Sequence, residues 1–158
     1  MRNPEKFIFV LIVSLITVMN LSASEIGRPF ITSYYPDETN GDYQTWAATQ
    51  DQRGVLYFGN GIGVLEYDGS NWRLIEIDKK NMIRSMDIDK QGRIYVGSIA
   101  EFGYLQPDSI GQLQYISLIS EISEDDQILE RVWTTHVTEE GIYFQARSRI
   151  FRFKLQGL

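Results

Sequence analysis

The sequence has no cysteine and only one histidine among its 158 residues. Without cysteine the chain cannot form a disulfide, a thiolate metal site or a cysteine nucleophile, and it offers no cysteine for lipid attachment. The single histidine, His136, has no partner at a spacing typical of metal ligands, so a structural place on a strand is the better interpretation. We therefore predict no metal ion and no cofactor.

Basic residues are also in deficit. The chain has 15 Lys and Arg residues against 21 Asp and Glu residues, a formal net charge of -6, which argues against binding of nucleic acid by this chain. The hydrophobic fraction of 43% and the charged fraction of 23% are those of a globular protein. Aromatic residues reach 13%, an enrichment that favours β-structure.

The longest hydrophobic run lies at the N-terminus. Arg2 and Lys6 precede an apolar segment over residues 7–19, and small residues follow at 22–24. That segment has 13 residues, which suits the core of a signal peptide and is short for a membrane span. We predict a helical signal peptide over residues 1–24 that exports the rest of the chain, with an uncleaved N-terminal anchor as the alternative.

The remaining sequence repeats its turn residues. Asp51 and Gly54 recur 38 positions later as Asp89 and Gly92, and a weaker third copy contains Gly141. The repeated positions are Asp51, Gly54, Gly59, Gly63, Asp68 and Gly69 in the first copy, Asp89, Gly92, Gly97, Gly103 and Asp108 in the second, and Gly141 in the third. Glycine supplies the positive φ angle that Asp-Gly turns need. Recurrence at about forty residues predicts tandem copies of one structural unit.

Each copy reads as a set of short strands rich in β-branched and aromatic residues. Four-stranded antiparallel units of this length are typical of β-propeller blades. We predict an all-β, incomplete β-propeller over residues 25–158, with blades at about 43–78, 82–119 and 131–158, the last lacking its fourth strand. We also expect a lone strand over 29–35. Since propellers have four to eight blades, we expect the chain to be the N-terminal part of a larger protein. We also expect the third blade of this chain to expose an apolar face on its open side.

The pattern Asp-x-x-Gly-x-aliphatic-aromatic-x-Gly, followed by Gly and Tyr-Asp-Gly, resembles the two-component-regulator propeller repeat. The second copy departs from it at Pro107, and the third at Ala146 and Arg149. The resemblance implies a periplasmic sensor region of a membrane-anchored bacterial signalling receptor or transcriptional regulator. It implies, as partners, further blades, a triple-tyrosine domain and an oligosaccharide or other small ligand, and it allows a homodimer. The output would be a histidine kinase or a helix-turn-helix module, neither of which is in this chain.

Two tryptophans and two arginines are the candidate ligand-binding residues. Trp46 and Trp133 fall on the first strands of their copies, which line the central channel of a propeller, and could stack on a sugar ring. Arg84 shares the position of Trp46 in its strand, and Arg131 neighbours Trp133. Core packing of the tryptophans is the competing interpretation.

No sequence motif indicates catalysis. The acidic run at 123–126 lacks the pattern of a calcium loop, and the glycines at 59–63 are not followed by a helix that could bind a phosphate. No Ser-His-Asp arrangement or catalytic carboxylate pair can be identified. We predict a binding protein and not an enzyme. The alternatives are a secreted propeller lyase or glycosidase, which would need an acid–base pair on the channel face, and a scaffold that binds a protein.

Overall fold

The structure is a computed structural model that describes residue 27 and residues 30–77, 81–127 and 130–154. The predicted signal peptide over 1–24 and the end of the chain from 155 lie outside these residues. The described residues from Tyr34 onward belong to one compact unit. The predicted strand over 29–35 is wrong, since the described residues 30–35 have no regular secondary structure. They lead into a short helix, α2 (Pro36–Thr39), whose first turn starts at a proline.

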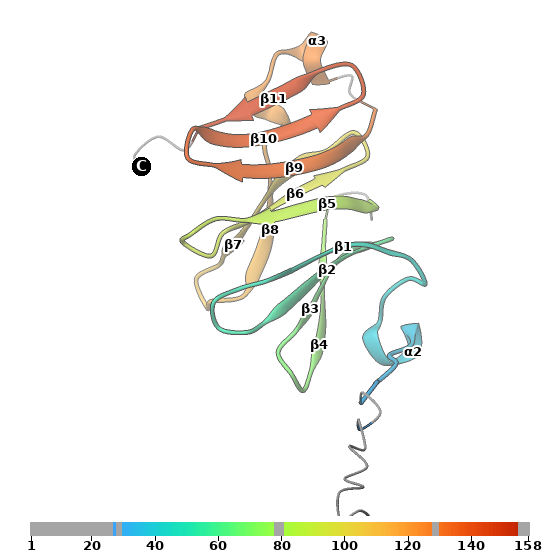
Figure 1. The fold of residues 1–158 in the computed structure, drawn as a ribbon. Helices are drawn as coiled ribbons and strands as arrows, with labels where there is room; N and C mark the ends of the chain where they lie inside the picture. Colours follow the sequence, from blue (N-terminus) through green and yellow to red (C-terminus); the bar gives the residue numbers. More distant parts are fainter. Residues whose placement is uncertain (1–26, 28–29, 78–80, 128–129, 155–158) are drawn as a thin grey trace, which may run out of the picture. The chain divides into compact units, whose positions relative to one another are not determined.

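The all-β class is confirmed, and the strands form three antiparallel sheets in chain order (Figure 1). The first sheet contains β1 (Thr45–Gln50), β2 (Leu56–Asn60), β3 (Gly63–Tyr67) and β4 (Trp72–Glu76). The second contains β5 (Ile83–Ile88), β6 (Ile94–Ser98), β7 (Phe102–Pro107) and β8 (Leu113–Ser117). The third contains β9 (Val132–Thr138), β10 (Gly141–Ala146) and β11 (Ile150–Phe153). Each sheet follows the order of its strands in sequence, as a blade does, but the described residues do not close a ring.

The segment between the second and third sheets contains two short helical elements. These are a 3-10 helix, η1 (Ile119–Glu121), and an α-helix, α3 (Glu124–Gln127). Most of the acidic run at 123–126 is therefore helical. Asp126 of this run forms an ion pair with Arg149, so α3 is tied to the loop before β11.

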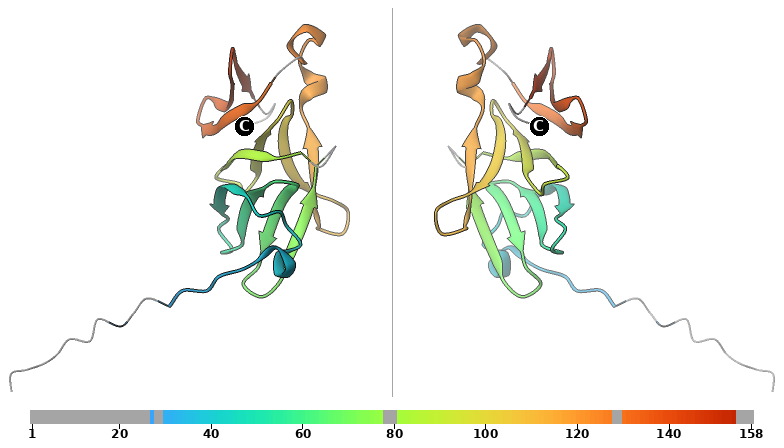
Figure 2. Two further views of the ribbon diagram at one scale, coloured as in Figure 1. Left: turned by 90° about the vertical axis from the view of Figure 1, so that its right-hand side faces the viewer. Right: turned by 90° about the vertical axis from the view of Figure 1, so that its left-hand side faces the viewer.

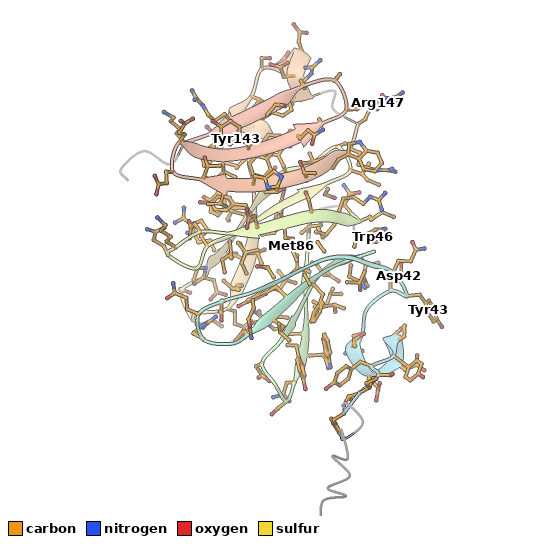
Figure 3. The ribbon with its side chains drawn as sticks, in the orientation of Figure 1. Asp42, Tyr43, Trp46, Met86, Tyr143 and Arg147 are labelled. Atoms are coloured by element: carbon orange, nitrogen blue, oxygen red, sulfur yellow. The ribbon has the colours of Figure 1, made fainter. Side chains whose placement is uncertain are left out.

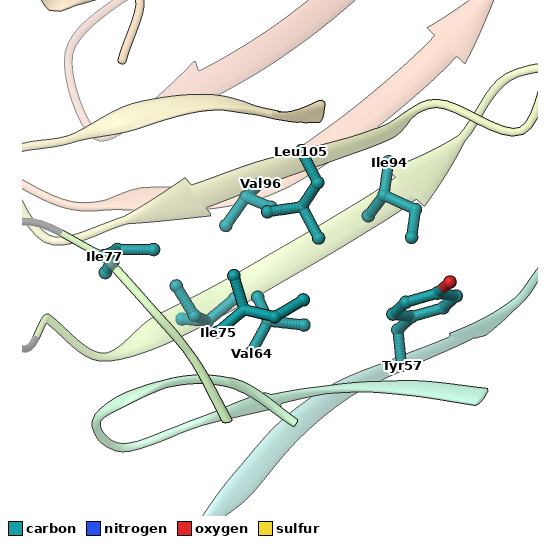
Figure 4. Close-up of a cluster of buried hydrophobic side chains, with 8 residues drawn as sticks. Tyr57, Val64, Ile75, Ile77, Ile94, Val96 and Leu105 are labelled. Atoms are coloured by element: carbon teal, nitrogen blue, oxygen red, sulfur yellow. The ribbon is translucent and has the colours of Figure 1, made fainter. Parts of the chain in front are cut away.

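Successive sheets stack face to face, with the inner strands β1, β5 and β9 beside one another (Figures 1 and 2). Each interface buries its own apolar cluster. The cluster between the first two sheets contains Tyr57, Val64, Ile75, Ile77, Ile83, Ile94, Val96 and Leu105 (Figure 4). The cluster between the second and third contains Tyr95, Phe102, Leu118, Val132, Ile142 and Phe144. The second sheet is thus apolar on both faces, which fits a unit that is stable only between neighbours.

The third sheet keeps the strand register of the second, although its first turn is one residue shorter. Ile88 pairs with Ile94 in the second sheet, and Val137 pairs with Ile142 in the third, with five and four residues between them. Counted from these pairs, Tyr143 occupies the position of Tyr95. Gly141 therefore lies one position away from the place that the sequence repeat assigns to it, next to the turn but not equivalent to Gly92.

The free face of the third sheet is mostly polar. Pairing places seven side chains on the face opposite the buried cluster, and they belong to Thr134, His136, Thr138, Tyr143, Gln145, Ile150 and Arg152. Only Ile150 among them is aliphatic, and it is 67% exposed. The expectation of an apolar open side is therefore wrong for most of this face. In the strand register, Gln145 of the third sheet occupies the position that Gly59 and Gly97 occupy in the first and second sheets.

Candidate ligand site at the start of the inner strands

The three inner strands carry the same irregularity at the same place. The pairing of β1 with β2 skips Trp46, that of β5 with β6 skips Arg84, and that of β9 with β10 skips Trp133. A β-bulge of this kind leaves one residue out of the ladder and redirects its side chain. One residue from each sheet is thereby directed away from the regular pleat near the start of its inner strand.

The redirected side chains meet. The guanidinium carbon of Arg84 lies 5.0 Å from the ring centroid of Trp46 and 5.2 Å from that of Trp133. The guanidinium carbon of Arg131 lies 4.8 Å from the Trp133 ring. The four candidate residues therefore form one alternating series, Trp46, Arg84, Trp133 and Arg131, that crosses three sheets. Each cation–π contact contributes about 0.5–1 kcal/mol at a site that is partly exposed to water.

The series is accessible on one side. Trp133 is 45% exposed, whereas Trp46, Arg84 and Arg131 are partly buried. Figure 3 shows Trp46 and Arg147 on the same side of the molecule, with Asp42 and Tyr43 closer to Trp46 than to Arg147. Neither indole belongs to the buried clusters between the sheets, so core packing does not account for them.

A cavity of about 450 Å³ adjoins this series, lined by Ile99, Glu130, Arg131, Trp133 and Arg147. Backbone contacts hold three of the lining residues in place, because Ile99 pairs with Arg131 and the Ala100 N–H donates to the Glu130 carbonyl at 2.6 Å. The Nε–H of Arg131 is buried without a hydrogen-bond partner among the described residues. An unsatisfied charged donor of this kind is unusual in a folded protein.

The cavity is lined by more positive than negative charge. Arg131 and Arg147 face a single carboxylate, Glu130, and Arg84 lies one indole ring away. The ion pair between Arg147 and Glu130 is long, at 3.5 Å, and both side chains are largely exposed. Such a pair contributes little to stability, so both side chains can rearrange at low cost.

A second hollow, of about 600 Å³, lies at the opposite ends of the inner strands, between the turns at Asp89 and Glu139. Its charged residues have both signs, and Lys90 and Glu139 within it pair at 3.3 Å. Its one aromatic residue, Tyr95, is fully buried. This hollow therefore lacks the exposed ring and the excess of one charge that characterise the first cavity.

The repeated aspartates shape turns and do not line the site. Asp51 Oδ1 accepts hydrogen bonds from the Arg53 and Val55 N–H groups, and Asp89 and Asp108 do the same two and four residues ahead. Burial alone would raise the pKa of Asp51, but the Arg53 side chain and these backbone N–H groups hold that pKa below its usual value. Asp68 organises its turn through the N–H groups of Ser70 and Asn71.

In the turns at Asp51 and Asp89, a tyrosine of the following strand binds the aspartate. The hydroxyls of Tyr57 and Tyr95 donate to Asp51 and Asp89 at 3.2 and 3.1 Å. Burial, reinforced by the Asp51 carboxylate, raises the pKa of Tyr57 to about 12. Burial likewise raises the pKa of Tyr95, with a contribution from its aspartate.

The repeated glycines serve the backbone. Gly54 and Gly92 have φ angles of +88° and +84°, which close the aspartate turns. Gly59 and Gly97 leave room for the next sheet, because a β-carbon there would lie 2.8 Å from Ile83 Cγ2 and 2.5 Å from Val132 Cγ1. The other repeated glycines are Gly63, Gly69, Gly103 and Gly141, and none of the repeat residues lines the cavity of about 450 Å³.

The sequence pattern missed three residues of the cavity, Ile99, Glu130 and Arg147. They lie in or beside connecting loops of the second and third copies, where the repeat is least regular. The composition of these loops carries no signal that would have identified them. His136 lies on β9 with its side chain exposed, opposite Tyr143 in the register.

Comparison with models of known protein families and with curated proteins finds no match to this chain. In the part of the chain that the structure describes, no three His, Asp or Glu residues gather as a metal site. No helix within that part has the length and hydropathy needed to cross a membrane.

Proposed function

We propose that this chain is the ligand-recognising part of an extracytoplasmic sensor, built from blades of a β-propeller and belonging to a bacterial transmembrane signalling receptor or transcriptional regulator. The observation that carries the proposal is the meeting of Trp46, Arg84 and Trp133 from three different sheets. An exposed indole face and guanidinium groups beside a cavity are suited to binding a small ligand such as an oligosaccharide.

The arrangement favours recognition over catalysis. The cavity contains a single carboxylate, Glu130, whereas glycoside hydrolysis uses a pair that flanks the scissile bond. A ligand that touches Trp133 and Arg84 would also bias the contact between the second and third sheets. Occupancy of the site would then be relayed through the stacking of the sheets to the following domains. Export to the periplasm through residues 1–24 completes the proposal.

Ligand-dependent stabilisation of the exported chain tests this function. The chain, expressed with its own N-terminal segment in a Gram-negative host, is purified and melted with neutral and acidic oligosaccharides from polysaccharide digests. At least one oligosaccharide should raise the melting temperature, because binding to the folded state alone stabilises it. Trp133→Ala should abolish the shift, while His136→Ala, an exposed residue of the same strand, should preserve it.

Absence of a shift across the whole panel, or retention of the chain in the cytoplasm, would refute the proposal. Cleavage of the bound oligosaccharide would also refute it, in favour of a carbohydrate-active enzyme. The panel needs no assumption about which chemical group is recognised.

A further inference from the structure

We infer that the cavity beside Trp133 takes a small anion attached to a ring, with the anionic group on Arg131 and Arg147 and the ring on the Trp133 indole. This inference rests on the proposed function and adds the chemical class of the ligand. The whole chain carries a net charge of -6, yet two of the three charged residues that line this cavity are arginines. A locally positive cavity on an acidic protein selects for negative charge in what enters it.

The two arginines are suited to a carboxylate in complementary ways. Arg131 contacts the Trp133 ring at 4.8 Å and its backbone pairs with Ile99, so the residue is positioned beside the cavity. Its Nε–H lacks an acceptor among the described residues, so the guanidinium gains a hydrogen bond if it turns toward an anionic oxygen in the cavity. A guanidinium presents parallel N–H groups that match the two oxygens of a carboxylate.

Arg147 is the exposed arginine of the pair. Its side chain is 76% exposed, and its only ion pair among the described residues is the 3.5 Å contact with Glu130. An incoming anion can therefore take the place of the Glu130 carboxylate without breaking a buried interaction. One anionic group then neutralises the single excess positive charge of the cavity, so a ligand with one anionic group is favoured over a ligand with none or several.

The ring requirement comes from Trp133. Its indole is 45% exposed, although Arg84 and Arg131 both contact it. A flat or pyranose ring can cover the remaining surface of the indole while its anionic substituent reaches the arginines. Uronic acid sugars and aromatic carboxylates share this chemistry, and neutral sugars lack the anion.

Paired probes separate these requirements on the exported chain. Glucuronic acid is compared with glucose, and benzoate with benzyl alcohol, so that each pair differs in the anionic group alone. Binding is followed by tryptophan fluorescence, since two of the three tryptophans lie in the site. The acidic member of at least one pair should bind, more weakly as salt rises, and its neutral counterpart should bind at least tenfold more weakly. The pair that responds identifies the ring as sugar or aromatic.

Substitutions assign the anion to its residues. Arg147→Gln should weaken binding of the acidic probe about ten- to hundredfold, the effect of one lost charge-assisted hydrogen bond. Arg131→Gln should have at least as large an effect. Arg152→Gln, an exposed arginine on the free face of the third sheet, should leave binding unchanged, and far-UV circular dichroism verifies that each variant is folded.

Two results would overturn the inference. One is equal binding of the acidic and neutral members of both pairs, with no effect of Arg147→Gln, and it would leave ligand recognition itself intact. The other is failure of both acidic probes to bind at millimolar concentration while a neutral oligosaccharide still stabilises the chain. If nothing in the oligosaccharide panel stabilises the chain either, the proposed function falls as well.

Discussion

The second and third sheets approach each other closely at Gly97 on β6, and the short distances there predict how much a larger residue would destabilise the fold. A β-carbon at this position would lie 2.5 Å from both Ser85 Oγ and Val132 Cγ1 and 2.8 Å from Thr135 Oγ1. Carbon atoms in contact are normally about 3.5–4 Å apart, so the inner strands would have to separate by about 1 Å. The buried hydrogen bond between Ser85 and Thr135, 2.7 Å long, would be lost as well. We expect Gly97→Ala to lower the free energy of unfolding by about 1–3 kcal/mol, the usual cost of overpacking.

Urea unfolding of the chain, followed by far-UV circular dichroism, measures this loss. Gln145→Ala is the matched control, because Gln145 holds the same register position in the third sheet with its side chain exposed, and it should cost less than about 0.5 kcal/mol. Val132→Ala should recover part of the loss in the Gly97→Ala background, since it removes one of the clashing atoms. A value for Gly97→Ala within 0.5 kcal/mol of wild type would refute this account of how the sheets stack.

Three further predictions concern buried polar groups. Tyr95→Phe should lower the free energy of unfolding in urea by about 1–2 kcal/mol, because it removes a partly buried hydroxyl that donates to the Asp89 carboxylate. Tyr143→Phe should have almost no effect, because the Tyr143 hydroxyl bonds to Glu140 at an exposed position. Equal losses in the two variants would contradict the stacking of the second and third sheets. Between about pH 10 and 12 the unfolded chain releases the Tyr57 proton and the folded chain keeps it, so the free energy of unfolding should fall as the pH rises, and Tyr57→Phe should flatten that fall. An unchanged pH slope in Tyr57→Phe would argue against a raised pKa. Asn60→Ala should lower stability by about 2–3 kcal/mol in thermal unfolding, since the buried amide bonds three backbone groups of the segment entering β1; a neutral effect would mean that water replaces those bonds.

The first two copies each form one four-stranded antiparallel sheet, as the sequence pattern predicts. Their turns are closed by Asp51 and Gly54 and by Asp89 and Gly92, whose side-chain bonds and positive φ angles are local properties. The turn at Glu139 has no aspartate to fix its length, so matching Gly141 to the earlier glycines missed the one-residue difference. Register there is decided by pairing across the sheet, which sequence spacing does not reveal.

The candidate site was predictable only as a set of residues. Trp46 and Arg84 fall at the same place in their copies, and that correspondence can be read from the sequence. The bulges that redirect them arise from the pairing of two strands, so neither the redirection nor the contacts within 5.2 Å could be foreseen. The segment before α2 was misjudged because Tyr34 makes ring contacts with Tyr67 and Trp72 and does not pair as a strand.

The three bulges also assign two tasks, packing between the sheets and contact with the surroundings, to different residues. A side chain at a skipped position takes no part in the ladder, and the apolar clusters between the sheets do not include it. Exchanging one for another changes what the molecule presents to its surroundings and leaves the apolar clusters untouched, at the cost of cation–π contacts between the sheets that contribute about 0.5–1 kcal/mol each. A lineage built from such units could therefore acquire new binding preferences one position at a time, without passing through unstable intermediates.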